Sequence, residues 1–170
     1  DAKVDYVKFQ TFKADKIVSK SAKKAKYQLK ENQKSLDKTQ FNMLKKLELS
    51  EKVHYELIDY CSSKNIKFCS TAFDLNGLDF LNKLNLDFFK VPSGEITNYP
   101  YLKKISSLGK TVVLSTGMSE IFEIEQAVKI LISGKIEKKN ITVLHCNTEY
   151  PTPMNDVNLK AMQTIKNSLK

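Results

Sequence analysis

The feature that most constrains the fold of this chain is a series of five short apolar runs, each ending in polar residues. The runs cover residues 4–11, 66–71, 87–93, 111–116 and 141–147, and segments with helical spacing of apolar residues separate them. Strands that alternate with helices predict a parallel α/β sheet. In an α/β barrel, the carboxyl ends of the strands form the face that carries the chemistry. The polar ends of the five runs therefore predict both a fold and the position of a functional site.

The spacing of these polar ends indicates a repeating unit. Thr71, Ser93 and Ser115 recur at equal intervals, and each interval fits a strand, a short helix and two turns, which take about 20–30 residues. The interval from Gln10 to Thr71 is much longer, so additional structure must lie there.

Capping residues indicate where the helices begin and end. We expect a long loop over residues 12–35, and later helices that start at Ser50, Asp74 and Ser119 as N-caps. Gly109 is the expected end of a helix over residues 98–108.

The number of strands bears on domain organisation. A closed (β/α)8 TIM barrel needs eight strands and about 250 residues, whereas this chain offers five candidate strands in 170 residues. We therefore interpret residues 1–170 as an interior part of a TIM-barrel domain in a longer protein. The alternative is a small open-sheet α/β domain.

Composition narrows the class of ligand. The net charge is +9, and apart from histidine every basic residue is lysine. The lysines are interspersed with acids and lack interleaved aromatics, so we expect a solvated surface and no nucleic-acid partner. Without arginine, any bound anion must be held by lysine, hydroxyl and backbone N–H groups. The three cysteines show no C-x-x-C pattern, which favours a cytoplasmic protein. No apolar run approaches the ~18 residues of a membrane helix, so we expect no membrane partner.

Two lysines and several hydroxyls are the strongest candidates for anion binding. Lys8 and Lys90 lie within apolar strands, where a lysine is expensive to bury without a partner. Hydroxyls follow at three successive strand ends, where they could form a phosphate cradle: Thr71, Ser93, Ser115 and Thr116. A lysine in such a pocket could instead form a Schiff base with a carbonyl substrate.

Other polar residues near the strand ends have further possible roles. Glu95 is a candidate acid/base group or substrate partner, and Tyr150 could contact a sugar. We interpret His145 as a core histidine. With only His54 besides, no metal cluster is predicted within this segment.

The motifs at these positions resemble the sialic acid synthase family, which includes N-acetylneuraminate, legionaminic acid and pseudaminic acid synthases. The matching segments span nearly the whole chain in order: VKFQTF at 7–12, STAFD at 70–74, KVPSGE at 90–95, LSTGM at 114–118, LHCNTEYPTP at 144–153 and DVNL at 156–159.

This resemblance implies an enzyme of carbohydrate biosynthesis, a transferase that forms a C–C bond on a TIM barrel. It would condense phosphoenolpyruvate with an N-acetylhexosamine aldehyde, such as N-acetylmannosamine, and water, giving a nonulosonic acid and phosphate. A divalent metal, Mn²⁺ or Mg²⁺, would polarise the aldehyde through ligands outside this segment. The family is also expected to form homodimers and to carry a C-terminal antifreeze-like domain, which this chain lacks.

The same resemblance assigns roles to individual residues. The phosphoenolpyruvate contacts would be Lys8, Thr71, Lys90, Ser93, Ser115 and Asn147, with the division of roles between Asn147 and Thr148 left open. The amino-sugar contacts would be Gln10, Asn32, Glu95 and Tyr150, with Glu95 also the catalytic candidate. The sequence from Asn147 to Tyr150 favours the sialic or legionaminic branch.

Two other functions stay open at this point. The first is a Schiff-base aldolase on a TIM barrel using Lys8 or Lys90. The second is a non-catalytic fragment or basic binding module, and we expect the isolated 170-residue piece to be inactive.

Overall fold

The structure is a computed structural model that describes residues 3–25 and 39–170. Within these residues the strands are β1 (Tyr6–Thr11), β2 (Lys67–Ala72), β3 (Phe88–Val91), β4 (Thr111–Ser115) and β5 (Ile141–Leu144). The helices are α1 (Ala14–Ile17), α3 (Gln40–Leu47), α4 (Glu51–Ser63), α5 (Leu75–Lys83), α6 (Tyr99–Leu108), α7 (Ile121–Ile132) and α8 (Ala161–Ser168), with 3-10 turns η1 (Ser93–Glu95), η2 (Lys138–Asn140) and η3 (Met154–Asp156). Every strand pair is parallel, so the predicted α/β class is confirmed.

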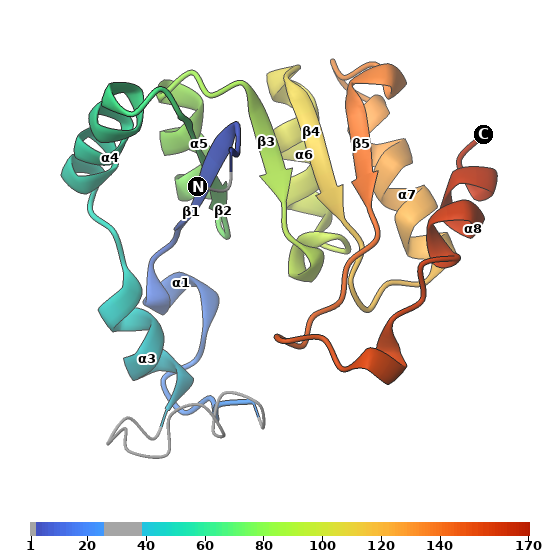
Figure 1. The fold of residues 1–170 in the computed structure, drawn as a ribbon, viewed down its shortest axis with the longest axis horizontal. Helices are drawn as coiled ribbons and strands as arrows, with labels where there is room; N and C mark the ends of the chain where they lie inside the picture. The colour runs from blue at the N-terminus through green and yellow to red at the C-terminus, as the bar shows by residue number, and fades with distance from the viewer. Residues whose placement is uncertain (1–2, 26–38) are drawn as a thin grey trace. The chain divides into compact units, whose positions relative to one another are not determined.

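The chain divides into two compact units, residues 1–77 and 78–170. The strands form two sheets, β1–β2 in the first unit and β3–β4–β5 in the second (Figure 1). The strands therefore do not form one continuous sheet, and closure into a TIM barrel stays a prediction.

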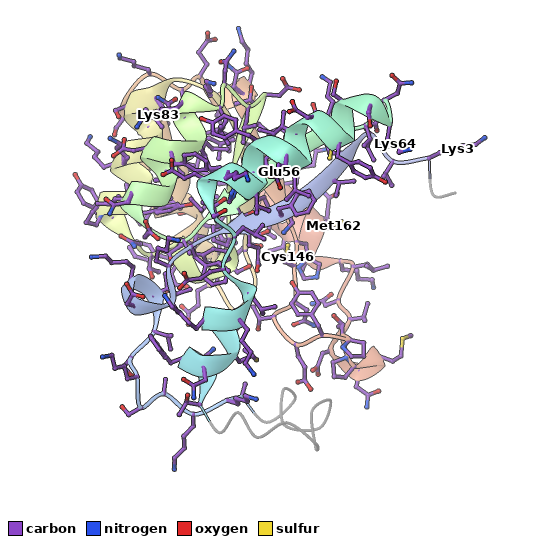
Figure 2. The ribbon with its side chains drawn as sticks, turned by 90° about the vertical axis from the view of Figure 1, so that its left-hand side faces the viewer. Lys3, Glu56, Lys64, Lys83, Cys146 and Met162 are labelled. Atoms are coloured by element: carbon purple, nitrogen blue, oxygen red, sulfur yellow. The ribbon has the colours of Figure 1, made fainter. Side chains whose placement is uncertain are left out.

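In the first unit, α4 packs on one face of the β1–β2 sheet. The Phe9 and Phe68 rings stack with centroids 5.2 Å apart, and His54, which is 1% exposed, meets the Phe68 ring edge-on. Ser50 caps α4 as predicted, because its hydroxyl accepts from the Val53 N–H at 3.2 Å. Figure 2 labels Glu56 on this helix and Lys64 directly after its last residue.

A buried hydrogen-bond chain connects α4 to the strands beneath it. The Nδ1 of His54 lies 2.8 Å from the Ser50 carbonyl oxygen, and its Nε2 lies 2.7 Å from Thr11 Oγ1. Thr11 Oγ1 also lies 2.7 Å from Ser70 Oγ. These hydrogen bonds give partners to the buried polar groups of His54, Thr11 and Ser70, which would otherwise destabilise the interface between helix and sheet.

The segment after β1 contains helix as well as loop. Part of the predicted 12–35 loop is the single turn α1, which Glu48 ties to α3. The Glu48 carboxylate accepts from the Ala14 N–H at 2.8 Å and from Lys45 Nζ at 3.0 Å. The Ala14 hydrogen bond, followed by that of Lys45, holds the pKa of Glu48 below its ordinary value. The hydrogen bond to Glu48, followed by that to Asp15, raises the pKa of Lys45. A backbone hydrogen bond, followed by that from Lys45, lowers the pKa of Asp15.

In the second unit, α6 and α7 cover one face of the β3–β4–β5 sheet (Figure 1). Strand side chains on this face are almost fully buried, among them Phe89, Val91, Val112 and Leu114. The helices bury Tyr101, Leu102, Ile105, Ile124, Ala127 and Leu131. Because side chains alternate along a strand, Lys90 and Ser115 lie on the opposite face.

Several predicted element ends are confirmed, and two are wrong. Asp74 accepts from the Gly77 N–H at 2.7 Å, and Gly109 ends α6 with a φ of 70°. Ser119 is not an N-cap. Its N–H closes the turn after β4 on the Thr116 carbonyl, and Glu120 precedes α7 instead. The last strand ends at Leu144, so the final three residues of the predicted 141–147 run lie beyond the strand. No helix among the described residues is long and apolar enough to cross a membrane.

Candidate functional site

Lys90 and Ser115 lie together where β3 and β4 end. The Lys90 ammonium donates to Ser115 Oγ at 2.6 Å and to the Val91 carbonyl at 2.8 Å. Lys90 is half-buried and Ser115 is 6% exposed. The structure thus brings two predicted phosphoenolpyruvate contacts into direct contact, with the lysine charge held among polar atoms.

Ser93 and Gly117 join the turns that follow the same two strands. The Gly117 N–H donates to Ser93 Oγ at 2.9 Å. A Cβ atom on Gly117 would lie 2.7 Å from Thr148 Cγ2 and 2.9 Å from Ser93 Oγ, so a larger residue would require the Thr148 and Ser93 side chains to move. The close approach of the backbone fixes the Ser93 hydroxyl at the strand ends.

Both serine hydroxyls keep a hydrogen that could be donated to a ligand. Ser115 Oγ accepts from Lys90 Nζ and also from Cys146 Sγ at 3.2 Å. A hydroxyl has two lone pairs and one hydrogen, so both acceptor positions of Ser115 are used and its hydrogen is left to donate. Ser93 also accepts a hydrogen bond, and no residue in the described ranges accepts the hydrogen of either serine. Two hydroxyl hydrogens beside an ammonium form a cluster suited to an anion.

The segment after β5 carries Cys146, Asn147, Thr148 and Tyr150. Figure 2 labels Cys146, which is half-buried. The Asn147 amide donates to the Asp156 carbonyl at 3.4 Å, whereas the Thr148 methyl lies against the backbone of Gly117. Tyr150 is 66% exposed. The roles of Asn147 and Thr148 therefore stay open, and Tyr150 is accessible to a ligand.

Glu95 lies in η1, directly after Ser93-Gly94. Its carboxylate accepts from Asn98 Nδ2 at 2.6 Å, and the side chain is half-buried. Asn98 also caps α6 by accepting from the Tyr101 N–H. The carboxylate is thus held at the end of β3 by a residue that the helix itself fixes.

In the first unit, Lys8, Gln10 and Thr71 share one face of the β1–β2 sheet. The parallel register pairs Gln10 with Thr71 and Lys8 with Cys69. Lys8 and Gln10 are exposed, whereas Thr71 is 2% exposed. Among the described residues, Thr71 Oγ1 is the buried side-chain oxygen that has no hydrogen-bond partner. A buried oxygen without a partner costs stability, so Thr71 is a strong candidate for binding a ligand.

Some sequence predictions fall outside this geometry or are wrong. Asn32 lies outside the described residues. His145 is not a core histidine. Because β5 ends one residue before it, His145 is exposed and lines a cavity of about 390 Å³. The described residues contain no group of three or more His, Cys, Asp or Glu side chains that could hold a metal ion.

Two features of the structure, one hydrogen bond and one buried side chain, were not predicted from the sequence. The Cys146–Ser115 hydrogen bond and the burial of His54 both depend on tertiary packing. The only sequence signal for the first was the position of Cys146 just after a strand, beside the predicted site.

A parallel α/β protein with an ammonium and hydroxyl donors at its strand ends has the architecture in which a functional site is expected at that face. The sequence model of the NeuB family matches residues 1–170, and this chain belongs to that family. The resemblance drawn from the motifs is therefore confirmed.

Individual relatives agree with this assignment. The chain is 54% identical over 170 residues to N,N'-diacetyllegionaminic acid synthase of Campylobacter jejuni, covering 100% of this chain and 50% of that protein. It is 45% identical over 163 residues to the synthase of the same name from Legionella pneumophila, covering 95% and 45%. The crystal structure of N-acetylneuraminic acid (sialic acid) synthetase from Leptospira borgpetersenii in complex with citrate superposes with a TM-score of 0.80 at 30% identity, covering 98% of this chain and 52% of that chain. The chain thus spans about half the length of the curated relatives it matches.

Proposed function

We propose that the protein containing this chain condenses phosphoenolpyruvate with an N-acetylhexosamine aldehyde and water, giving a nonulosonic acid and phosphate. The observation that carries the proposal is the cluster of Lys90, Ser93 and Ser115, in which each serine accepts a hydrogen bond within the protein and keeps its hydrogen for a ligand. Membership in the NeuB family supports the same reaction class.

The proposed first substrate to test is a hexosamine that carries two acetamido groups. The 54% identical relative is named for a product with two N-acetyl groups. Phosphoenolpyruvate contains no nitrogen, so both acetamido groups of such a product must come from the hexosamine. This choice agrees with the sialic or legionaminic leaning of the sequence from Asn147 to Tyr150.

In the proposed reaction, C3 of phosphoenolpyruvate forms a bond to the aldehyde carbon, and the aldehyde oxygen takes a proton. The C2=C3 double bond is consumed in this step, and water adds to C2. Phosphate then leaves as the bond between C2 and the bridging oxygen breaks and the C2 carbonyl forms, and the two protons of the water end on the aldehyde oxygen and on phosphate. Lys90 and Lys8 neutralise the anionic groups, while the hydroxyls of Ser93, Ser115 and Thr71 orient them.

The sugar side of the proposed site uses Gln10, Glu95 and Tyr150, with Asn147 completing the phosphoenolpyruvate side. Glu95 is the candidate to hold or move a proton at the aldehyde oxygen, because its carboxylate is half-buried and fixed by Asn98. The described residues do not form a metal site. We therefore propose that the ligands of the expected Mn²⁺ or Mg²⁺ lie elsewhere in the protein, which we also propose is a homodimer.

The test is an assay of the full-length protein with phosphoenolpyruvate and, in turn, the di-N-acetylated hexosamine, N-acetylmannosamine and the pseudaminic precursor. We expect phosphate release and a nine-carbon keto acid, identified by mass spectrometry, with one of the first two substrates. Turnover with the pseudaminic precursor alone would refute the assignment to the sialic or legionaminic branch. A borohydride-trapped adduct on Lys8 or Lys90 would indicate a Schiff-base aldolase instead. Salt-sensitive nucleic-acid binding without turnover would indicate a basic binding module.

A further inference from the structure

We propose that Cys146 is a positioning residue for the anion site, whose thiol directs the Ser115 hydroxyl hydrogen toward bound phosphoenolpyruvate. The inference rests on the proposed function and adds to it a residue of the 144–153 motif to which none of the proposed roles was assigned.

The argument begins with the hydrogen bonds around Ser115 Oγ. Lys90 Nζ donates to this oxygen at 2.6 Å and Cys146 Sγ donates to it at 3.2 Å. Because the ammonium and the thiol both donate, they use the two lone pairs of the hydroxyl. The Ser115 hydrogen is then directed away from both neighbours.

Removal of the thiol would leave one lone pair of Ser115 without a partner. The hydroxyl could then rotate about its C–O bond, and the hydrogen would spend part of its time away from the ligand. The bound anion would lose part of a charge-assisted hydrogen bond, although Lys90 and Ser115 would both remain in place.

The position of Cys146 fits this role. It follows β5, the strand that neighbours β4, so its side chain reaches the carboxyl end of β4 where Ser115 lies. The other two cysteines, Cys61 and Cys69, are each 4% exposed and belong to the first unit. Cys61, on α4, is a matched control for the loss of a buried thiol.

The experiment compares Cys146→Ala, Cys146→Ser and Cys61→Ala in the full-length protein. Phosphoenolpyruvate affinity is measured by calorimetry, KM is measured for each substrate, and thermal unfolding is followed for each variant. We expect Cys146→Ala to weaken phosphoenolpyruvate binding about three- to tenfold, as befits one weak hydrogen bond, with the hexosamine KM changed less than about twofold. Cys146→Ser keeps an O–H donor and should recover most of the affinity, while Cys61→Ala should bind phosphoenolpyruvate as the wild type does.

Three outcomes would overturn the inference. One is wild-type affinity in Cys146→Ala. The second is a Cys146→Ser variant that binds as weakly as Cys146→Ala with the same fall in melting temperature, which would mean that the thiol only fills space. The third, a wild-type protein that does not bind phosphoenolpyruvate, would overturn the proposed function as well. The first two leave the proposed function standing.

Discussion

Replacement of Thr71 by valine should change stability and ligand binding in opposite directions. Thr71 is 2% exposed, and no described residue bonds its Oγ1. A buried hydroxyl without a partner costs about 1–3 kcal/mol. Valine replaces this hydroxyl with a methyl group of similar size, so Thr71→Val should raise the free energy of unfolding of the ligand-free protein by about 1–2 kcal/mol.

The same substitution should weaken phosphoenolpyruvate binding. A hydrogen bond from a hydroxyl to a charged oxygen contributes about 1.5–3 kcal/mol, so its loss should raise the Kd about ten- to hundredfold. Urea denaturation of the full-length protein, with and without saturating phosphoenolpyruvate, measures both effects in one experiment. The variant should be the more stable protein without ligand and should gain less stability when ligand is added.

Thr11→Val is the matched control, because Thr11 is also a buried threonine at the end of a neighbouring strand. Its hydroxyl is bonded to both His54 and Ser70. Loss of that hydroxyl should lower the free energy of unfolding by about 1–3 kcal/mol. If Thr71→Val destabilised the protein as Thr11→Val does, or bound phosphoenolpyruvate with wild-type affinity, the assignment of Thr71 as a ligand contact would be refuted.

Three further predictions concern charge, pH and metal. Lys90→Met should weaken phosphoenolpyruvate binding at least about tenfold in calorimetry, because the Ser115 hydroxyl loses its charged neighbour; wild-type affinity would contradict this. Glu48 has a pKa below its ordinary value of 4.5 in the folded protein, so its ionised form stabilises the fold above that pH and the effect is lost as pH falls toward the folded pKa. Glu48→Gln should therefore lower the unfolding free energy by about 1 kcal/mol at pH 7 in urea titrations, and this loss should shrink as the pH falls below 4.5; a loss that does not change with pH would show that charge is not the cause. Dialysis against EDTA should abolish condensation in the full-length protein, with recovery on adding Mn²⁺, and turnover that survives chelation would remove the metal from the proposal.

The sequence was sufficient to predict that Lys90, Ser93 and Ser115 of the second unit lie at one edge of the sheet. Lys90, Ser93 and Ser115 stand at the ends of apolar runs with regular spacing, and parallel strands bring such ends to one edge. The alternation of side chains along a strand also places Lys90 away from the face that the helices cover. Strand pattern and spacing are local properties, so they can be recognised without tertiary contacts.

Tertiary contacts decide which buried hydroxyls have partners and which side chains are exposed, and the sequence pattern alone does not predict either. Thr11 and Thr71 have similar positions in the sequence pattern, yet the Thr11 hydroxyl has two partners and the Thr71 hydroxyl has none among residues 3–25 and 39–170. The difference arises because α4 brings His54 over one face of the sheet only. The prediction for His145 was wrong for a related reason. Strand β5 ends at Leu144, the residue before His145, and the His145 side chain is therefore exposed.

In an anion site without arginine, the positive charge and the directed hydrogen bonds must come from different residues. A guanidinium supplies both, because its planar fork matches two oxygens at once, whereas a lysine ammonium is a point charge with little directional preference. In the proposed site the direction would come from two hydroxyls, Ser93, which accepts from the Gly117 N–H, and Ser115, whose two acceptor positions are used by Lys90 and Cys146. Loss of a lysine charge should therefore weaken binding of every small anion alike. Changes at the hydroxyls or at the groups that orient them should instead reduce the preference for phosphoenolpyruvate over inorganic phosphate.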